Sequence, residues 1–556
     1  MATSAQPPAA FGWRHVLFAL LAYSGLALQL LAPALDGPIV SDDALLFVGQ
    51  AHMEELSLAN VKTILDPRGE PVRVTANWAP VHLLAHVLEI EAFGSPLENP
   101  RPFHVVNALV HAVNATLFAA LLAAQGVPAL GALLAGLLFL VHPANVETVA
   151  WIFQLKTLLA ASFGFGALLA LRKRPGVATL LFALALLAKP SASAVLAAAI
   201  VFEWLRAPAA GEPPRRTGWL VAWGALLLLY TVPEFTAFLN VGEFRGELPL
   251  GERALQAVAI VGRYLVLAVA SLGSSTFHQP TPPASPLDAW FGLGLLTLLG
   301  LALLSVDALR GRQLAAGWLG LAAAAYVPVA QIFPFRYPMA DRYLYFVLPG
   351  LLGAAAVALA PWLARSLEQL RERGRRAVTA GVVALAVLVS GASVAFAARF
   401  RERAAVWASP DTVEADAAAH YPDGIPGQVS LARRRLEAGD YDGAVEAIER
   451  ARARGHTNPA AFLYDPDFQQ LLEHPRYVEL LRDMTEGWLA RARALPVQTV
   501  SSWMGIGHAE LFMGRLDRAR EAFDLARGMA DPEERAAIDE TLAELDRIEA
   551  APENQQ

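Results

Sequence analysis

Residues 103–124 read Phe-His-Val-Val-Asn-Ala-Leu-Val-His-Ala-Val-Asn-Ala-Thr-Leu-Phe-Ala-Ala-Leu-Leu-Ala-Ala. As a helix, this stretch is long enough to cross roughly 30 Å of hydrocarbon. Its polar residues recur at i, i+3, i+7 and i+10, so a helix carries them as one stripe on an otherwise apolar surface. These residues are His104, Asn107, His111 and Asn114. Because lipid cannot hydrogen-bond such a stripe, we expect a membrane helix whose polar face meets protein or water.

Similar apolar runs recur through the first 400 residues, and the composition agrees with them. The chain is 55% hydrophobic and 17% charged, with a mean hydropathy of +0.40, which exceeds what a soluble protein carries. We therefore expect an all-α, polytopic membrane helix bundle. The first run lacks a signal-peptide cleavage pattern, so we expect it to be retained. The runs lie near residues 15–35, 103–124, 127–142, 149–171, 177–188, 190–205, 217–233, 254–272, 288–308, 314–333, 343–363 and 377–398.

Clusters of basic residues predict the orientation of the bundle, because such clusters stay in the cytoplasm. Twelve full crossings would place one cluster outside, so we expect that one run does not cross. The weakest is 254–272, which has Arg263 at its middle. About eleven crossings then leave residues 36–102, the turn from Pro334 to Arg342 and the C-terminus on the external face of a bacterial inner membrane. The clusters are Arg172-Lys173-Arg174, Arg206 with Arg215 and Arg216, Arg310 with Arg312, and Arg365 to Arg376.

Residues 401–556 have a different composition. They carry 18 basic and 29 acidic residues, a net charge of −11, whereas the preceding 400 residues carry +4 of the total of −7. This predicts a water-soluble domain after a membrane domain of residues 1–400. The modest net charge argues against nucleic acid as a partner. Since the chain has no cysteine, disulfides, thiol nucleophiles and Cys-ligated metals are excluded.

The soluble tail carries a repeated helical pattern. Small, aromatic and turn positions occur at the offsets of a tetratricopeptide repeat. We expect an α-solenoid of two such repeats, with diverged helices between them, that binds peptides on a concave surface. A module that only stabilises the membrane domain is the alternative. The positions are Trp503, Gly507, Gly514, Ala519, Phe523 and Ala526, and Gly439, Ala444 and Ala451 fit the same frame.

Ionisable residues next to membrane spans are candidates for function, because burying them is costly. Asp42 and Asp43 follow the first run directly. Such a pair could bind a divalent cation or supply a general base, or it could simply cap the helix expected at residues 44–50. His82 and His86 have metal-ligand spacing, but no third ligand is evident, so we favour hydrogen bonding between helices.

Three cations, Lys156, Lys189 and Arg342, are expected at the same external face, beside an aromatic wall of Trp78, Trp151 and Tyr343. Cations neutralise a leaving phosphate, and a carboxylate deprotonates an incoming hydroxyl, so this set suits a phosphorylated lipid substrate. Snorkelling to the interface is the alternative for Lys189 and Arg342. The chain contains no Walker-type loop or dinucleotide fingerprint, which disfavours a soluble nucleotide substrate.

Several blocks together resemble the transmembrane and tetratricopeptide-repeat O-mannosyltransferases and their bacterial relatives, over roughly residues 35 to 530. The resemblance implies a GT-C-type glycosyltransferase fold, a polyprenyl-phosphate-linked sugar as donor, the Asp42–Asp43 pair in the first external loop and an external tetratricopeptide domain. The relatives tend to carry an Arg and an Asp around a Lys where this chain has Gln154-Leu155-Lys156-Thr157, so donor contacts should differ there. The blocks are Phe93-Gly94, His104 to Ala112, His142 to Ile152, Leu187-Ala188-Lys189-Pro190 and Ala340 to Tyr345.

We therefore expect an inverting, lipid-linked-sugar-dependent glycosyltransferase that moves a sugar, mannose by resemblance, to a hydroxyl of an exported protein or glycan. One of Asp42 and Asp43 would be the base, and Lys156, Lys189 and Arg342 would bind the donor phosphate. The alternatives are a non-catalytic scaffold that recruits partners through its repeats and, less favoured, a lipid flippase. The pocket would be lined by Trp78, His82, His104, His142, Glu147, Trp151, Asp341 and Tyr343.

Overall fold

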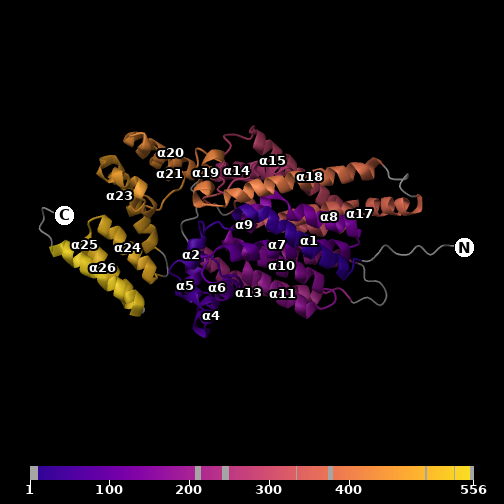
Figure 1. Ribbon diagram of the computed structural model, residues 1–556, viewed down its shortest axis with the longest axis horizontal. Coiled ribbons are helices and arrows are strands. Elements are labelled where there is room, and N and C mark those ends of the chain that lie inside the picture. The colour runs from indigo at the N-terminus through magenta and orange to yellow at the C-terminus, as the bar shows by residue number, and fades with distance from the viewer. Residues whose placement is uncertain are drawn as a thin grey trace. The chain divides into compact units, whose positions relative to one another are not determined.

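The computed structural model describes residues 11–206, 214–240, 249–332, 335–373, 380–494, 498–530 and 532–550 (Figure 1). Within these ranges every regular element is a helix, as the sequence predicts. The chain divides into two compact units. The first, here the membrane unit, comprises Met1–Phe235 and Gly246–Tyr421, and the second, the tail unit, comprises Thr236–Arg245 and Pro422–Gln556.

The membrane unit contains the apolar helices. Among the described residues, eight helices are long and apolar enough to cross a membrane, and the pair α8–α9, bent by 55°, would make a ninth. Three shorter apolar helices cover Pro175–Ala188, Pro190–Leu205 and Ala315–Val329. Every predicted apolar run falls on one of these helices, while the number of eleven crossings stays a prediction. The α-helices are α1 (Trp13–Leu31), α2 (Asp43–Phe47), α3 (Ala51–Glu54), α4 (Leu58–Leu65), α5 (Glu70–Thr75), α6 (Pro80–Phe93), α7 (Arg101–Ala124), α8 (Ala129–Leu140), α9 (Val146–Ala150), α10 (Leu155–Ala170), α11 (Pro175–Ala188), α12 (Ser193–Leu205), α13 (Thr217–Asn240), α14 (Leu250–Ala270), α15 (Ala289–Arg310), α16 (Ala315–Tyr326), α17 (Val347–Arg373), α18 (Ala380–Val406) and α19 (Pro410–His420).

The polar stripe on α7 holds the centre of this unit together. Its members are all buried. The His111 Nε2 donates to the carbonyl of Leu140 at 3.0 Å, and its Nδ1 lies 2.7 Å from the Tyr345 hydroxyl. The Asn114 amide donates to the carbonyl of Leu158 at 2.9 Å and to the same hydroxyl at 3.0 Å. The prediction that this stripe meets protein or water is therefore confirmed, whereas the hydrogen bonding between helices predicted for His82 and His86 is not seen among the described residues, since His86 pairs with Glu89 on its own helix.

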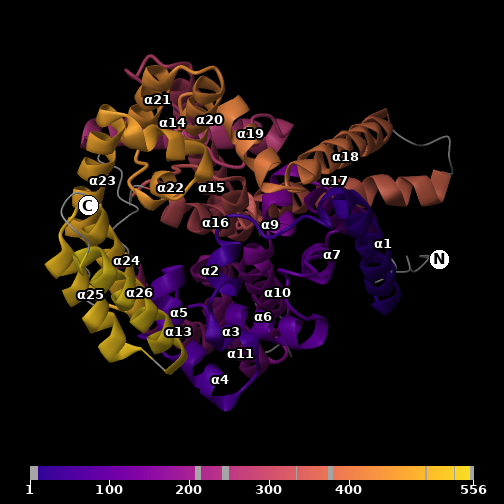
Figure 2. The same ribbon diagram turned by 60° about the vertical axis from the view of Figure 1, so that its left-hand side comes forward.

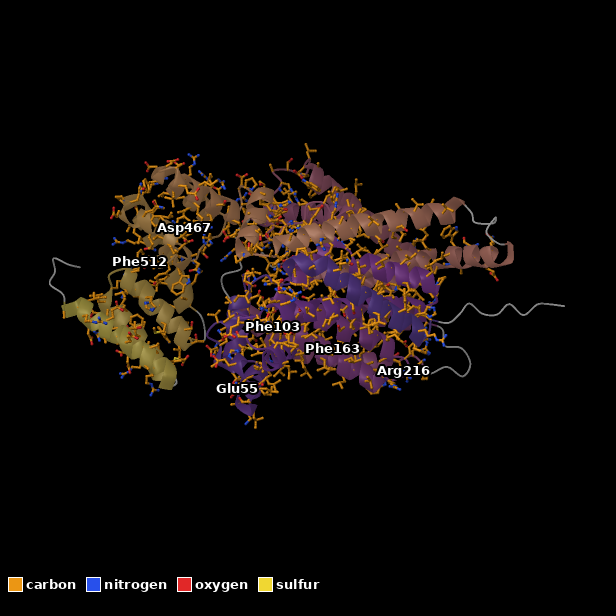
Figure 3. All side chains as sticks on the ribbon, in the orientation of Figure 1. Glu55, Phe103, Phe163, Arg216, Asp467 and Phe512 are labelled. Carbon is orange, nitrogen blue, oxygen red and sulfur yellow. The ribbon has the colours of Figure 1, made fainter. Side chains whose placement is uncertain are left out.

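The predicted basic clusters gather at one end of the bundle, here called the basic end. The Arg216 guanidinium donates to the carbonyl of Arg172 at 2.7 Å, and that of Arg312 donates to the carbonyl of Trp204 at 3.3 Å. Figure 3 shows Arg216 at the opposite end of the membrane unit from Glu55, which belongs to the loop of residues 36–102. This opposite end is called the loop end. Residues 374–376 of the fourth cluster, residues 377–379 of the last predicted run, and Pro334 lie outside the described residues.

The predicted non-crossing run, 254–272, forms α14. At 21 residues it is long enough to cross, and Arg263, which singled it out in the sequence, lies 4.5 Å from the ring of Trp290 on α15. Its last turn lies at the loop end, because the carbonyl of Ala268 accepts a hydrogen bond from His142 at 2.9 Å. The length of α14 therefore gives no reason to exclude it from the membrane-crossing helices. That α14 does not cross the membrane stays a prediction.

The tail unit consists of helices that pack in sequence order, with α24, α25 and α26 side by side (Figure 2). Two helical hairpins, α20–α21 and α24–α25, turn at Gly439 and Gly514, which have φ values of 74° and 73°. Both residues were predicted as turn glycines, and only glycine adopts this conformation without strain. The helices are α20 (Ile425–Glu437), α21 (Tyr441–Ala453), α22 (Ala460–Leu463), α23 (Pro475–Arg493), α24 (Val500–Phe512), α25 (Leu516–Met529) and α26 (Pro532–Ala550).

The division between the units falls later than the predicted boundary after residue 400. Helix α19 packs on the membrane unit because Asp416 forms an ion pair with Arg403 and accepts a hydrogen bond from the amide of Thr276 at 3.1 Å. The hydroxyl of Thr276 donates to the carbonyl of Val413 at 2.7 Å. These contacts extend the membrane unit to Tyr421.

Candidate active site

The Asp42–Asp43 pair lies where the chain turns from α1 into the loop end. Ser41 has a φ of 52°, an uncommon left-handed value for a residue other than glycine, and α2 begins at Asp43. Asp43 is 1% exposed, whereas Asp42 is half-buried. The turn therefore sends the two carboxylates into different environments.

Asp43 is held by the backbone. One of its carboxylate oxygens accepts the amide of Val40 and the other accepts the amide of Phe153, both at 2.8 Å. Burial raises the pKa of Asp43 to about 7, although these two amides favour the ionised form. Because both oxygens are occupied, Asp43 positions the segment at Phe153 and is not itself available to a substrate.

Asp42 is the available carboxylate. Its only described hydrogen bond is a long one from the Ser41 hydroxyl, at 3.5 Å. Among the charged neighbours of Lys156, Asp42 interacts most strongly with its ammonium, and Asp42 also attracts the guanidinium of Arg342. The structure therefore places one free carboxylate beside two predicted phosphate ligands.

Lys189 is held by the segment of residues 154–157. It lies at the break between α11 and the short helix Pro190–Ala192. Its Nζ donates to the Thr157 hydroxyl at 2.6 Å and to Gln154 Oε1 at 3.3 Å, and Thr157 also donates to Gln154 at 2.7 Å. Lys156 and Arg342 are its nearest charges of like sign. Gln154 and Thr157 thus orient Lys189 without neutralising it.

Arg342 is tethered by Glu147, which is buried on α9. Two groups of Arg342 bond to the Glu147 carboxylate: the backbone amide at 2.7 Å, and the guanidinium, which forms an ion pair. The guanidinium carbon lies 5.2 Å from the ring of Trp151 and 5.1 Å from that of Tyr343. Since the Arg342 side chain stays 21% exposed, its remaining donors can meet a ligand.

Asp42, Lys156, Lys189, Arg342 and Glu147 are here called the Asp42 cluster. Trp151 contacts this cluster through Arg342, and its buried ring stacks with those of Phe153 and Trp407.

Three predicted lining residues have structural partners instead. His104 donates to the carbonyl of Gly37 at 3.0 Å, and His142 donates to that of Ala268. Asp341 Oδ1 lies 2.7 Å from a ring nitrogen of His278. Each side chain satisfies a buried group where a helix ends or breaks, so these three residues stabilise the fold around the cluster.

His82 and Trp78 lie closer to the cluster. Burial, together with His86 and the ammonium groups of Lys156 and Lys189, holds the pKa of His82 well below its usual range, so its ring is neutral. The Nε2 of His82 is buried and has no hydrogen-bond partner in the described part of the chain. Trp78 stacks on Tyr230 with ring centres 5.8 Å apart.

The sequence prediction missed Glu234. This residue lies near the end of α13, where its carboxylate accepts the amide of Trp78 at 2.7 Å and interacts with Lys156. A carboxylate directly after Pro233 in an apolar run was the signal that could have identified it.

A divalent cation between Asp42 and Asp43 does not fit this donor set. Both oxygens of Asp43 are occupied by amides, and Asp42 faces Lys156 and Arg342, whose charges would repel a cation. Among the residues that the structure describes, no group of three or more His, Cys, Asp or Glu side chains could hold a metal.

No protein-family model and no curated protein matches the chain.

Proposed function

We propose that this chain is an integral membrane glycosyltransferase of the GT-C type. It would move one sugar, mannose by the resemblance described above, from a polyprenyl phosphate to a hydroxyl of an exported protein or glycan. One observation carries the proposal: the half-buried carboxylate of Asp42, with one long hydrogen bond in the described part of the chain, interacts with Lys156 and Arg342, and Lys189 neighbours both cations.

The reaction follows from this arrangement. Asp42 takes the proton of the acceptor hydroxyl as that oxygen attacks the anomeric carbon. The bond from the anomeric carbon to the phosphate oxygen breaks, and its electron pair leaves with the polyprenyl phosphate. Cations beside the phosphate stabilise the charge that develops there. One direct displacement inverts the configuration of the sugar.

The three cations have different parts in this reaction. Lys156 and Lys189 carry no ion-pairing carboxylate within hydrogen-bond distance among the described residues, so their amines are available to the donor phosphate, whose negative charge favours their protonated form. Arg342 forms an ion pair with Glu147, and its remaining N–H groups can donate hydrogen bonds to the phosphate. Asp43 and Glu234 hold the backbone around the site, through the amides of Phe153 and Trp78.

The positions of the charges support an external site. The basic end carries the arginine clusters that the positive-inside rule assigns to the cytoplasm. The Asp42 cluster belongs to the loop end, where a lipid-linked sugar, and not a cytoplasmic nucleotide sugar, would be the donor. We place the site and the tail unit on the periplasmic face of a bacterial inner membrane. The hairpins that turn at Gly439 and Gly514 support a tetratricopeptide-like solenoid for the tail unit.

The second candidate is a non-catalytic scaffold. It is favoured by the number of buried polar side chains that only hold helices together, such as His104, His111 and His142. A scaffold would tolerate the loss of Asp42, whereas an enzyme would not.

Sugar transfer by the purified chain tests the proposal. The full-length protein in nanodiscs is incubated with polyprenyl phosphates that carry radiolabelled mannose, glucose, galactose or N-acetylglucosamine, together with serine- and threonine-containing peptides. We expect transfer from at least one donor, and a loss of about 100-fold in the Lys189→Met variant. Lys173→Met, which removes an exposed lysine at the basic end, is the control and should transfer normally. Absence of transfer from every donor would favour the scaffold.

A further inference from the structure

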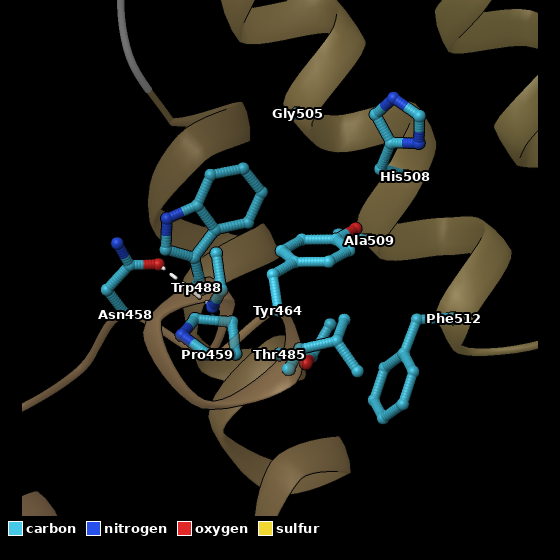
Figure 4. A pocket seen from close by; sticks show the side chains of 11 residues that line it. Asn458, Pro459, Tyr464, Thr485, Trp488, Gly505, His508, Ala509 and Phe512 are labelled. Carbon is cyan, nitrogen blue, oxygen red and sulfur yellow. Dashed lines mark hydrogen bonds between the residues drawn. The ribbon is translucent and has the colours of Figure 1, made fainter. Parts of the chain in front are cut away.

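A cavity in the tail unit is not used by the proposed chemistry. It has a volume of about 410 Å³ and opens between α22, α23 and α24 (Figure 4). This volume falls within the range of protein sites that bind small ligands or short peptide segments. The lining residues are Asn458, Pro459, Ala460, Leu463, Tyr464, Thr485, Trp488, Gly505, His508, Ala509 and Phe512.

Three aromatic side chains from three parts of the unit line the cavity. They are Tyr464, just after α22, Trp488 on α23 and Phe512 on α24, as Figure 4 shows. Tyr464 is 62% exposed, an unusual exposure for a ring that faces a cavity. A Cβ at Gly505 would lie 3.2 Å from the indole of Trp488, so glycine at this position avoids a close contact with the indole. The cavity therefore offers flat apolar surfaces that the fold does not cover.

The lining is uncharged. It contains no Asp, Glu, Lys or Arg, although 47 of the 95 charged residues of the chain belong to residues 401–556. Burial lowers the pKa of His508, so its ring is neutral at physiological pH. A ligand that matches this surface is itself uncharged.

Asn458, Trp488 and Tyr464 each offer a hydrogen-bond donor at the cavity. Asn458 Oδ1 accepts the amide of Ala460 at 3.1 Å, which leaves the Asn458 Nδ2 group to donate. The indole N–H of Trp488 can only donate, and in the described part of the chain neither it nor the Tyr464 hydroxyl has a hydrogen-bond partner. These donors need a ligand with free carbonyl oxygens.

We infer that this cavity binds an extended, proline-rich and uncharged polypeptide segment, which would carry the serine or threonine to be glycosylated. A polyproline II segment has no internal hydrogen bonds, so its carbonyls are free, and its proline rings pack on aromatic side chains. In a helical peptide the backbone carbonyls accept hydrogen bonds within the helix, so they are not free to accept from the donors of this cavity. A glycan, whose hydroxyls both donate and accept, is the other uncharged ligand for such a lining, and the experiment below distinguishes it. The role of the segment as acceptor rests on the proposed function.

Peptide binding to the full-length protein, without any sugar donor, tests this inference. Fluorescence anisotropy in nanodiscs compares a labelled peptide of repeated Ala-Pro-Thr-Pro with one of repeated Ala-Ala-Thr-Ala. We expect the proline peptide to bind at least about tenfold more tightly. Tyr464→Ala should weaken its binding about tenfold, and Trp488→Phe, which keeps a ring but removes the N–H, should weaken it less. Tyr441→Ala removes a partly exposed tyrosine outside the cavity and should bind as the wild type does.

Each result decides the inference. Equal binding of the two peptides, or unchanged binding in both cavity variants, would overturn it. Binding of a labelled mannose oligosaccharide that Tyr464→Ala weakens, with no binding of either peptide, would assign the cavity to a glycan and overturn it as well. The Asp42→Asn variant should bind the proline peptide normally. Binding without sugar transfer in the wild type would therefore count against the proposed enzyme alone, and transfer without binding would count against the cavity alone.

Discussion

Replacing Asp43 by Asn should separate the structural carboxylate from the catalytic one. Burial raises the pKa of Asp43 from its ordinary value of 3.8 to about 7. Between these values the folded state binds more protons than the unfolded state, so Asp43 lowers the stability of the fold as pH rises from about 4 to about 7. Since one pKa unit corresponds to about 1.4 kcal/mol, the ionised carboxylate costs the folded state about 4 kcal/mol above pH 7.

Asn keeps the shape of Asp43 but does not ionise. The Nδ2 group of Asn cannot accept the second backbone amide, which should cost the variant about 1–3 kcal/mol at every pH. Relative to wild type in mixed micelles, the free energy of unfolding of Asp43→Asn should therefore rise by up to about 4 kcal/mol between pH 4 and pH 8. Asp42→Asn, which changes a half-buried side chain, should follow the wild-type profile. Identical pH profiles for wild type and Asp43→Asn would refute this assignment of the buried carboxylate.

The rate of sugar transfer should depend on Asp42, whereas the pH dependence of stability should depend on Asp43. Asp42→Asn removes the proposed general base and should lower the rate of sugar transfer by about 100- to 10,000-fold. Asp43→Asn keeps one acceptor oxygen for the backbone and should retain most of the activity. If Asp43→Asn abolished transfer while Asp42→Asn did not, the roles given to the two carboxylates would be reversed.

Three further predictions concern the frame around the site. Glu147→Gln leaves the Arg342 guanidinium without its ion-pair partner and should lower the free energy of unfolding by about 3–5 kcal/mol. The double variant Glu147→Gln, Arg342→Met, measured in the same unfolding experiment, should regain most of this free energy. Because the chain has no cysteine, a single introduced cysteine reports on which side of the membrane it lies. In intact cells, a membrane-impermeant maleimide should label Glu55→Cys but not Lys173→Cys. Labelling of Lys173→Cys would contradict the predicted orientation. Gly439→Ala places a Cβ at a φ of 74° and should lower the stability of the tail unit by about 1 kcal/mol in chemical unfolding, whereas no change would show that the turn tolerates a side chain.

The membrane helices were predictable because hydropathy and helical periodicity are local properties of a sequence. The stripe on α7 is the clearest case, since His111 and Asn114 could meet only other helices or water. The number of crossings was not predictable in the same way. It depends on helices such as α11 and α12, with 14 and 13 residues, which are shorter than the roughly 20 residues that a span needs.

The site could be predicted only in part. The cost of burying charge pointed to Lys156, Lys189 and Arg342, which the structure brings within interaction range of one another, while their role as phosphate ligands stays a prediction. The difference between Asp42 and Asp43 could not be read from the sequence. It depends on the amide of Phe153, which lies 110 residues away along the chain and points at one carboxylate and not at the other.

The roles of polar residues at helix breaks could not be predicted from the sequence. His104 and His142 were expected to line a pocket, but each hydrogen-bonds a carbonyl of a distant segment. A polar residue near a functional site and one that satisfies a broken helix have the same local sequence, so only the tertiary partners distinguish them.

The most direct test of the central claim is the configuration of the sugar product. Purified wild-type protein is given a polyprenyl-phosphate sugar of one defined anomer, and the linkage formed on the acceptor is determined by NMR, with Asp42→Asn measured in parallel. Direct displacement by a hydroxyl that Asp42 deprotonates predicts the opposite anomer in the product, and almost no product from the variant. A product that retains the configuration of the donor, or equal product from the variant, would contradict the account.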